Sequence, residues 1–310
     1  MVVLITGANG QLGQSLQFIA KNYPFVDFKF CDSKTLDITN LENINKVFKH
    51  YKPQFCINTA AYTAVDKAES EPEKAFAINV TGVKNLAEVC KEFDTTLIHI
   101  STDFVFDGTT TELSVTNGYN EKAKTNPKSV YGQTKLDGEK AIQNILEKYI
   151  IIRTSWVYSQ FGNNFLKTML RLASEKDSLS VVADQIGTPT NAVDLADAII
   201  KIISLKFEDK SLKIEKEISS ENPPKLLLPT SNFGIYNFSN LGQCSWYDFA
   251  KKIFEIQNIN IDLKPIPTSS YPTPALRPKY SVLDKSKIIN TFGIEIITWE
   301  ESLKKVFFNL

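Results

Sequence analysis

Two side chains that could perform acid–base chemistry stand four residues apart in the segment SVYGQTKLDGEK, residues 129–140. Tyr131 and Lys135 would share one face of a helix, because residues at i and i+4 are neighbours on a helix surface. A tyrosine can donate a proton to a developing alkoxide, but its ordinary pKa of about 10 is high for exchange at neutral pH. A lysine one helical turn away favours the phenolate and lowers that pKa. The pair is either a proton donor with its activator or a ring beneath a solvated amine.

A third catalytic group is predicted at the end of an apolar run. The segment IHISTDFVFDG, residues 98–108, carries Ser101 and Thr102 where a buried strand should end. Ligands of parallel sheets bind at the carboxyl ends of the strands. Because alternation along a strand points neighbouring side chains to opposite faces, only one hydroxyl can face the site. We predict that Thr102 holds a substrate carbonyl, with Ser101 as the competing hydroxyl.

A glycine-rich turn near the start of the chain predicts a nucleotide site. VVLITGANGQLGQSL places Gly7, Gly10 and Gly13 between a strand and a helix. Such glycines let the backbone approach a pyrophosphate, which the amides of the following helix then bind. Asp32 lies 19 residues beyond Gly13, where an acid is expected to accept hydrogen bonds from a ribose. The alternatives are a plain tight turn and a turn-forming aspartate. The glycine spacing resembles that of the short-chain dehydrogenase/reductase superfamily.

The elements that must position these groups alternate along the first half of the chain. Short runs rich in Val, Ile, Phe and Thr predict strands, and the stretches between them predict helices. The strands are expected at 2–6, 27–32, 54–60, 95–102 and 149–155, and the helices at 11–21, 40–50, 72–93 and 130–148. This alternation predicts an α/β fold, a Rossmann-like doubly wound parallel sheet with helices on both faces.

The second half is expected to form a smaller α/β region. We predict an NAD(P)-binding domain at 1–160, whose sheet is completed by 180–205 and 234–240, and a mainly substrate-binding region at 161–310. Further helices are expected at 163–175, 191–205 and 245–257. Residues 206–229 are charged and interrupted by a Pro-Pro pair, and we interpret them as an exposed insertion.

Bulk properties exclude several classes of protein. Among 310 residues, 35 basic and 35 acidic side chains balance, without the excess of positive charge that nucleic-acid binding uses. The four cysteines form no CxxC pair, which favours reduced thiols over disulfides or a zinc site. Neither a leader peptide nor a run of about 20 apolar residues is seen. We expect a cytoplasmic protein that binds neither nucleic acid nor membrane.

Several longer blocks make the resemblance specific. INTAAYTAVDKAESEPEKAFAINVTGVKNLA, HISTDFVFDG, YGQTKLDGEKA, RTSWVY, DQIGTPT and SYPTPALRPKYSVLD together resemble the dTDP-4-dehydrorhamnose reductase family of extended short-chain dehydrogenases. The resemblance implies reduction of dTDP-4-dehydro-L-rhamnose to dTDP-L-rhamnose, a precursor of cell-surface polysaccharide, with NADPH or NADH. Tyr131 would then donate the proton, Lys135 would activate it and bind the cofactor ribose, and Thr102 would hold the carbonyl.

The resemblance also implies binding residues. It places Asp103 and Trp156 at the sugar nucleotide. Arg277 is a further candidate for the substrate, because the fork geometry of its guanidinium suits a bidentate clamp on the diphosphate. The cofactor would be bound by Gly10, Gln11, Leu12, Asp32, Asp37, Ile38, Ala61, Tyr62 and Thr63, in addition to Gly7 and Gly13 of the turn. The competing interpretations are a core aromatic for Trp156 and a locally paired charge for Arg277. The acids Asp66, Glu69, Glu71 and Glu73 are expected to be a solvated helix start.

The chain departs from its relatives at one place. Some members bind magnesium near a subunit contact through three glutamates, and the matching positions here are Ser15, Val193 and Glu300. Mg²⁺ needs oxygen ligands, usually including carboxylates, so we predict no bound metal there and only a possible homodimer. His50 and His99 are isolated and predict no metal site.

Two other functions compete with the reductase. Another extended short-chain dehydrogenase acting on a nucleotide sugar, such as an epimerase, would hold NAD tightly and return the hydride. A non-catalytic NAD(P)-binding regulatory subunit would have no chemical reason to keep Thr102, Tyr131 and Lys135 together.

Overall fold

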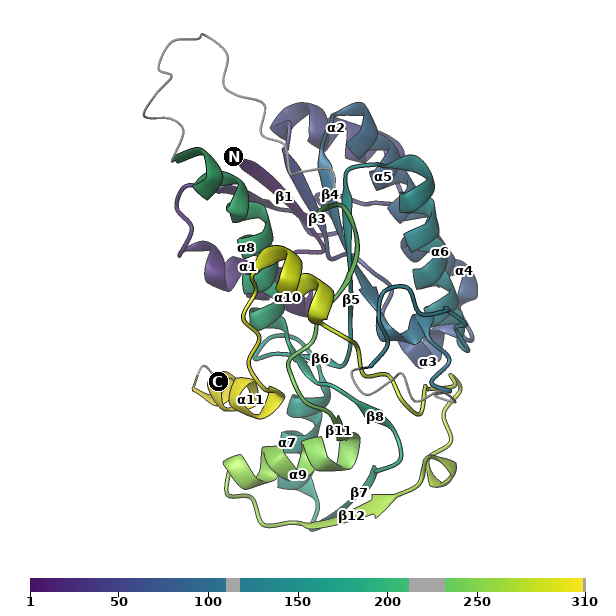
Figure 1. Ribbon diagram of the computed structural model, residues 1–310. Coiled ribbons are helices and arrows are strands. Elements are labelled where there is room, and N and C mark those ends of the chain that lie inside the picture. The colour runs from purple at the N-terminus through teal and green to yellow at the C-terminus, as the bar shows by residue number, and fades with distance from the viewer. Residues whose placement is uncertain (110–117, 212–231, 309–310) are drawn as a thin grey trace.

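A six-stranded parallel sheet forms the centre of the protein (Figure 1). The computed structural model describes residues 1–109, 118–211 and 232–308. The strand order is β10-β5-β4-β3-β1-β2. The strands are β1 (Val2–Thr6), β2 (Asp27–Phe30), β3 (Phe55–Asn58), β4 (Thr96–Thr102), β5 (Tyr149–Thr154) and β10 (Gly234–Asn237). The order reverses between β1 and β3, and ligands of such sheets bind outside the carboxyl ends at that point.

Helices cover both faces of the sheet. One face packs against α1 (Gln11–Ala20), α8 (Ala192–Ser211) and α10 (Ser286–Phe292). The other face packs against α2 (Leu41–Tyr51), α5 (Val83–Glu92) and α6 (Val130–Ile145). The central strands are buried on both sides, which is why they are continuously apolar instead of alternating. The predicted doubly wound α/β sheet is confirmed.

A smaller unit lies below the carboxyl edge of the sheet in Figure 1 and has its own apolar core. In it β7 (Ser178–Val182) pairs in parallel with β12 (Asp262–Ile266). The pair packs with α7 (Phe165–Glu175), α9 (Trp246–Ile256) and α11 (Trp299–Phe307). Short pairings join β6 (Val157–Tyr158) to β9 (Thr190–Asn191) and β8 (Ile186–Gly187) to β11 (Cys244–Ser245).

Two expectations about the second half are changed by the structure. The expected stretch 234–240 contains β10, but β7, which overlaps the start of the expected stretch 180–205, does not join the central sheet. The rest of that stretch serves the sheet as α8, which packs on α1. The first residues of the expected insertion, 206–211, continue α8. The remainder of that insertion, 212–229, lies outside the described residues.

The helix expected at 72–93 is interrupted by one wide turn. It consists of α4 (Pro72–Phe76), the π-helix η1 (Ala77–Gly82) and α5. Single π-turns inside helices are frequent at functional sites. Here the turn carries Asn79, which is completely buried and whose side-chain amide donates to the Thr134 hydroxyl of α6 at 3.1 Å. Asn79 therefore ties η1 to the helix that carries the predicted proton donor.

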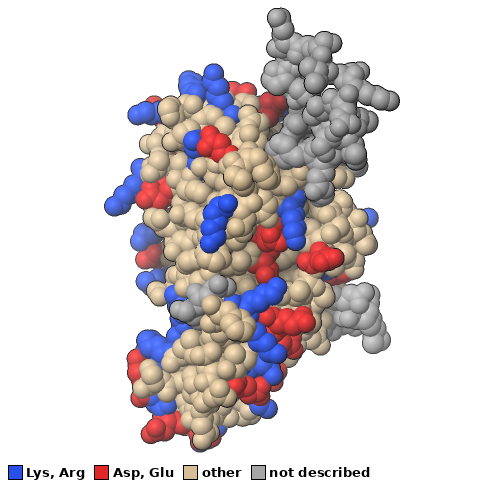
Figure 2. Space-filling view, turned by 90° about the vertical axis from the view of Figure 1, so that its left-hand side faces the viewer, with Lys and Arg blue, Asp and Glu red and all other residues tan. Residues whose placement is uncertain are grey.

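Charged side chains of both signs are interspersed over the face of the molecule seen in Figure 2. Neither sign gathers there into an extended patch, in keeping with the balanced composition of the chain. Within the described residues, no helix is both long enough and apolar enough to cross a bilayer.

Candidate active site

A cleft of about 670 Å³ opens at the carboxyl edge of the sheet. It collects residues from the glycine turn, from the ends of β3, β4 and β5, from α6 and from the smaller unit. Eleven of the predicted site residues line it. They are Gly10, Gln11, Leu12, Ala61, Thr63, Thr102, Asp103, Tyr131, Lys135, Trp156 and Arg277. The fold thus brings the predicted catalytic and substrate residues, and part of the predicted cofactor residues, to one cavity.

Tyr131 lies in the first turn of α6, where the Ser129 side chain caps the helix by accepting from the Gly132 amide at 3.1 Å. The helix presses closely on η2 (Asp103–Val105), because a Cβ on Gly132 would lie only 2.3 Å from the Phe104 carbonyl oxygen. The pKa of Tyr131 is raised to about 12, mainly by burial, with a hydrogen bond to Thr102 lowering it and the negative charge of Asp103 adding to the rise. The phenol is therefore held protonated, as a proton donor must be.

Lys135 is 2% exposed, and its amine is held by β4. Nζ donates to the Ile100 carbonyl at 2.7 Å and lies 3.2 Å from Nε2 of His99. Burial lowers the pKa of Lys135 to about 8, while the carboxylate of Glu139 acts in the opposite direction. The sequence suggested that Lys135 lowers the pKa of Tyr131, but in this structure burial of the phenol outweighs any such effect.

The two competing hydroxyls have different partners. Ser101 donates to Glu139 at 2.5 Å, and Glu139 forms a buried ion pair with Arg153 at 2.7 Å. Thr102 instead contacts Asp103 at 3.1 Å and Tyr131. Burial raises the pKa of Asp103 to about 6. The geometry therefore favours Thr102 as the hydroxyl beside the proton donor.

The glycine turn is shaped by close backbone approach. Gly7 has φ +64°, and a Cβ there would lie 2.6 Å from the Ala60 backbone nitrogen. A Cβ on Gly13 would lie 2.5 Å from the Gly7 carbonyl oxygen. Gly10 is the N-cap of α1 and offers no capping side chain to the first amides of the helix. Such a helix start fits the phosphate groups of a dinucleotide.

The other predicted cofactor residues do not line the cleft. One Asp32 oxygen accepts from the Thr35 amide and hydroxyl at 2.9 Å, which helps to hold the pKa of Asp32 below its ordinary value. Asp37 likewise accepts from Thr39, and Ile38 is buried in the core. Asp32 and Asp37 therefore have turn-forming contacts, whatever else they bind.

Trp156 combines unusual backbone geometry with a stacked partner. Its φ is +48°, a strained value that clusters at functional sites in non-glycine residues. Its ring stacks on Trp246 with centroids 3.6 Å apart and an interplanar angle of 8°. The ring also covers Gly187, where a Cβ would lie 2.6 Å from Trp156 Cε2. Both indoles line the cleft.

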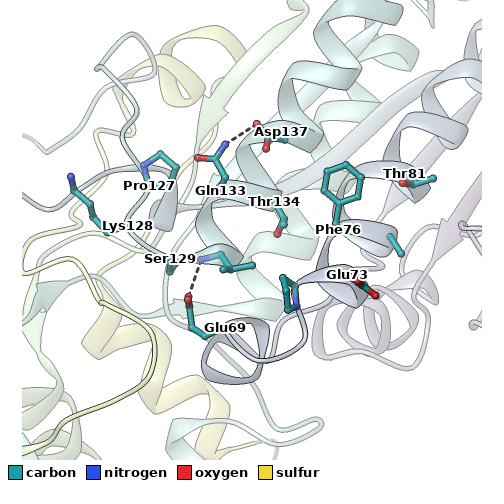
Figure 3. A pocket seen from close by; sticks show the side chains of 13 residues that line it. Glu69, Glu73, Phe76, Thr81, Pro127, Lys128, Ser129, Gln133, Thr134 and Asp137 are labelled. Carbon is teal, nitrogen blue, oxygen red and sulfur yellow. Dashed lines mark hydrogen bonds between the residues drawn. The ribbon is translucent and has the colours of Figure 1, made fainter.

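Arg277 reaches the cleft in partnership with Asp66 of α3 (Val65–Ala68). The guanidinium donates to both carboxylate oxygens, at 3.0 and 2.7 Å, and lowers the pKa of Asp66. The expected solvated helix start is therefore wrong for Asp66. It is also wrong for Glu69, whose carboxylate accepts from the Val130 amide at 2.8 Å and so caps α6 (Figure 3). For Glu69 the reason is that α3 packs against α6. For Asp66 it is the contact with Arg277, which comes from a segment distant in the sequence.

Comparison with known proteins shows the family of the chain. Residues 1–310 match the family described as the RmlD substrate binding domain. A dTDP-4-dehydrorhamnose reductase of Aggregatibacter actinomycetemcomitans is 40% identical over 311 residues, covering 98% of this chain and 97% of that one. The chain belongs to the dTDP-4-dehydrorhamnose reductase family.

Solved structures of the dTDP-4-dehydrorhamnose reductase family share the whole architecture. The enzyme from Clostridium acetobutylicum has a TM-score of 0.86 at 41% identity, covering 100% of this chain and 99% of that one. The enzyme from Bacillus anthracis, solved in complex with NADP, has a TM-score of 0.85 at 38% identity, with the same coverage. A UDP-glucose 4-epimerase of Thermus thermophilus, at 18% identity and a TM-score of 0.76, shares the fold.

Beyond the residues suggested by the family resemblance, the cleft contains several that the sequence did not reveal. Trp246, Asn163 and Asn164 line it, and Asn164 donates to the Gln11 side-chain oxygen at 2.9 Å. This contact joins the glycine turn to the start of α7. Asn164 had a detectable signal, because Asn is a preferred N-cap and its side chain accepts from the Lys167 amide. Trp246 had none, since an aromatic at the start of a helix is ordinarily core.

The positions of the family's magnesium ligands are occupied differently here. The Ser15 hydroxyl donates to the Gln11 carbonyl at 2.8 Å and is buried. Among the described residues, His, Cys, Asp and Glu side chains form no group of three or more that could hold a metal ion. The absence of a metal at Ser15, Val193 and Glu300 stays a prediction.

A second, more open hollow of about 850 Å³ lies across α4, η1 and α6 (Figure 3). Its lining includes Glu69, Phe76, Gln133 and Asp137, and Gln133 donates to Asp137 at 2.8 Å. The hollow shares no residue with the Tyr131 cleft. We therefore place the chemistry in the cleft.

Proposed function

We propose that the protein reduces the C4 carbonyl of dTDP-4-dehydro-L-rhamnose with NADPH or NADH, giving dTDP-L-rhamnose. Tyr131 beside Thr102 in a cleft that also holds the glycine turn carries this proposal. When bound, the nicotinamide supplies the hydride. Residues 1–160 would bind the cofactor and residues 161–310 mainly the substrate. A homodimer and a cytoplasmic location stay predictions.

The residues of the cleft then have distinct tasks. Tyr131 gives the proton of its phenol to the oxygen of the reduced carbonyl, and Thr102 holds that oxygen in place. Lys135, one helical turn from Tyr131, balances the negative charge that the phenolate would carry. A positioned acid of this kind typically contributes about 10²- to 10⁴-fold to rate.

Substrate binding would use the other side of the cleft. Arg277 has the planar donor geometry that suits a diphosphate. Because Asp66 already holds the guanidinium at two points, Arg277 is oriented before substrate arrives. The stacked indoles of Trp156 and Trp246 present a flat apolar surface, against which a sugar or base face can pack.

Two features bear on the choice of cofactor. One carboxylate oxygen of Asp32 accepts from Thr35. The other accepts from the side-chain amide of Asn9 at 3.3 Å and lies near the expected ribose position. Lys34 is exposed in the same turn and could bind a 2′-phosphate. These two groups favour different cofactors, and we propose that the protein uses either.

The test is direct reduction. Purified protein is mixed with dTDP-4-dehydro-L-rhamnose and either NADPH or NADH, and cofactor loss and sugar product are followed together. We expect stoichiometric oxidation and the appearance of dTDP-L-rhamnose. Tightly held NAD that co-purifies and returns its hydride would identify an epimerase instead. No turnover with either cofactor would exclude the reductase.

A further inference from the structure

A histidine that is isolated in the sequence contacts the predicted catalytic lysine in the fold. His99 lies on β4 and is 0% exposed. Its Nε2 is 3.2 Å from Nζ of Lys135, and its Nδ1 is 3.0 Å from the Asn58 side-chain nitrogen on β3. Both neighbours ordinarily donate hydrogen bonds, whereas a neutral imidazole has one donor and one acceptor nitrogen.

The contacts of Asn58 decide which way its amide faces. Its oxygen accepts from the Thr6 hydroxyl at 2.6 Å and from the Ala60 backbone amide at 3.2 Å. Because a backbone amide can only donate, the Asn58 oxygen faces Thr6 and Ala60. The NH₂ group of Asn58 therefore faces His99 and donates to Nδ1.

The tautomer of His99 follows from this orientation. Since Nδ1 accepts from Asn58, the proton of the neutral ring resides on Nε2 and points at Lys135. An ammonium group has three donors and no acceptor, but a neutral amine has a lone pair that can accept. The buried chain of hydrogen bonds from Thr6 through Asn58 to His99 thus ends in an N–H donor, which suits an uncharged Lys135 amine.

We propose that His99 is a positioning residue that sets the charge of Lys135, by presenting an Nε2–H donor that binds the neutral amine and disfavours the ammonium. The catalytic part of this inference rests on the proposed function, but the hydrogen-bond chain does not. After Tyr131 has given up its proton, an N–H bond of the Lys135 ammonium breaks and the O–H bond of Tyr131 forms again. The amine then accepts from His99 until solvent returns its proton.

The other groups around the amine are accounted for. Glu139, on the same helix, raises the pKa of Lys135, but it is paired with Arg153 of β5. The Ile100 carbonyl accepts from the amine in either charge state. The charge of Asp103 raises the pKa of Tyr131. Burial lowers the pKa of Lys135 to about 8 and that of His99 well below its ordinary value, so the imidazole stays neutral.

The wild-type protein tests the tautomer without any variant. The chain has only two histidines, so ¹⁵N-histidine labelling gives two imidazole signals. His50 lies exposed at the end of α2, and its signal is assigned with the variant His50→Gln. We expect His99 to show the neutral Nε2–H pattern at all pH values between about 6 and 9. Its shifts should change near pH 8, where Lys135 titrates. An Nδ1–H tautomer would overturn the proposal.

A kinetic comparison tests the consequence for Lys135. In His99→Gln the carboxamide oxygen can accept from the ammonium, which favours the charged form. We expect the alkaline limb of kcat/KM to move up by about one pH unit, with the matched control His50→Gln unchanged. An unmoved limb, or one displaced to lower pH, in a folded His99→Gln protein would refute the proposed role. If the protein shows no reductase activity at all, the tautomer measurement still decides the hydrogen-bond chain.

Discussion

Replacing Gly187 by alanine should displace the Trp156 indole from the cleft. A Cβ at this position would lie 2.6, 2.7 and 2.8 Å from Cε2, Cζ2 and Nε1 of the ring. Ordinary van der Waals contact begins near 3.4 Å, so the ring must retreat by almost 1 Å. The Trp246 ring stacked on it restricts that retreat. The added methyl group therefore displaces Trp156, a side chain that we assign to substrate binding.

The size of the effect follows from the collision. Overpacking a well-filled site costs about 1–3 kcal/mol of stability. A displacement of about 1 Å at a binding group can cost about 10²-fold in rate. We expect kcat/KM for dTDP-4-dehydro-L-rhamnose to fall by about 10- to 100-fold, mainly through KM, while cofactor affinity changes little.

The assay pairs steady-state kinetics with urea unfolding and uses Gly293→Ala as the matched control. Gly293 has φ +63°, and among the described residues no neighbouring atom lies within 4 Å of where a Cβ would stand, so alanine there causes backbone strain without a collision. That strain costs about 1–2 kcal/mol. The control should lose comparable stability with its KM unchanged. An unchanged KM in Gly187→Ala, or an equal rise in both variants, would refute the assignment of Trp156 to substrate binding.

Three further predictions follow from the buried polar groups. Thr102→Val should lower kcat by about 10²-fold or more, whereas Ser101→Ala should mainly lower the free energy of unfolding; equal losses of kcat would contradict the assignment of the hydroxyls. Arg153→Met should destabilise the protein by about 3–5 kcal/mol in urea unfolding, because it leaves Glu139 buried and unpaired; the two charges are 3% and 1% exposed, and a loss below about 1 kcal/mol would show that they are solvated. Burial raises the pKa of Asp103 from 3.8 to about 6, so the folded state binds an extra proton between these values and stability should fall as pH rises through that window. Asp103→Asn should reduce this pH dependence of the free energy of unfolding, and an unchanged pH dependence in the variant would contradict the assignment to Asp103.

The sheet and the catalytic trio were predictable because their signals are local. Continuous apolar runs identify strands that are buried on both faces, and the glycine turn follows the first of them directly. Tyr131 and Lys135 are identified by their spacing of one helical turn, and Thr102 by its position at the end of one strand. Each of these inferences uses residues close together in the chain.

What escaped prediction depends on contacts between distant segments. The Arg277 guanidinium meets Asp66 across 211 positions, so neither side chain alone indicates the pair. Trp246 becomes a cleft residue only because the start of α9 stacks it on Trp156, which is distant in the sequence. The strand β7 has an ordinary strand pattern, and its pairing with β12 is decided by the smaller core. Likewise, His99 looks like a core residue until α6 places Lys135 against it.

The central claim is that Tyr131 donates the proton in a carbonyl reduction. Its most direct test is the single-turnover rate of Tyr131→Phe with bound cofactor and dTDP-4-dehydro-L-rhamnose, measured beside wild type. We predict a rate lower by about 10²- to 10⁴-fold, with cofactor binding and folding retained. A rate equal to that of wild type would contradict the account.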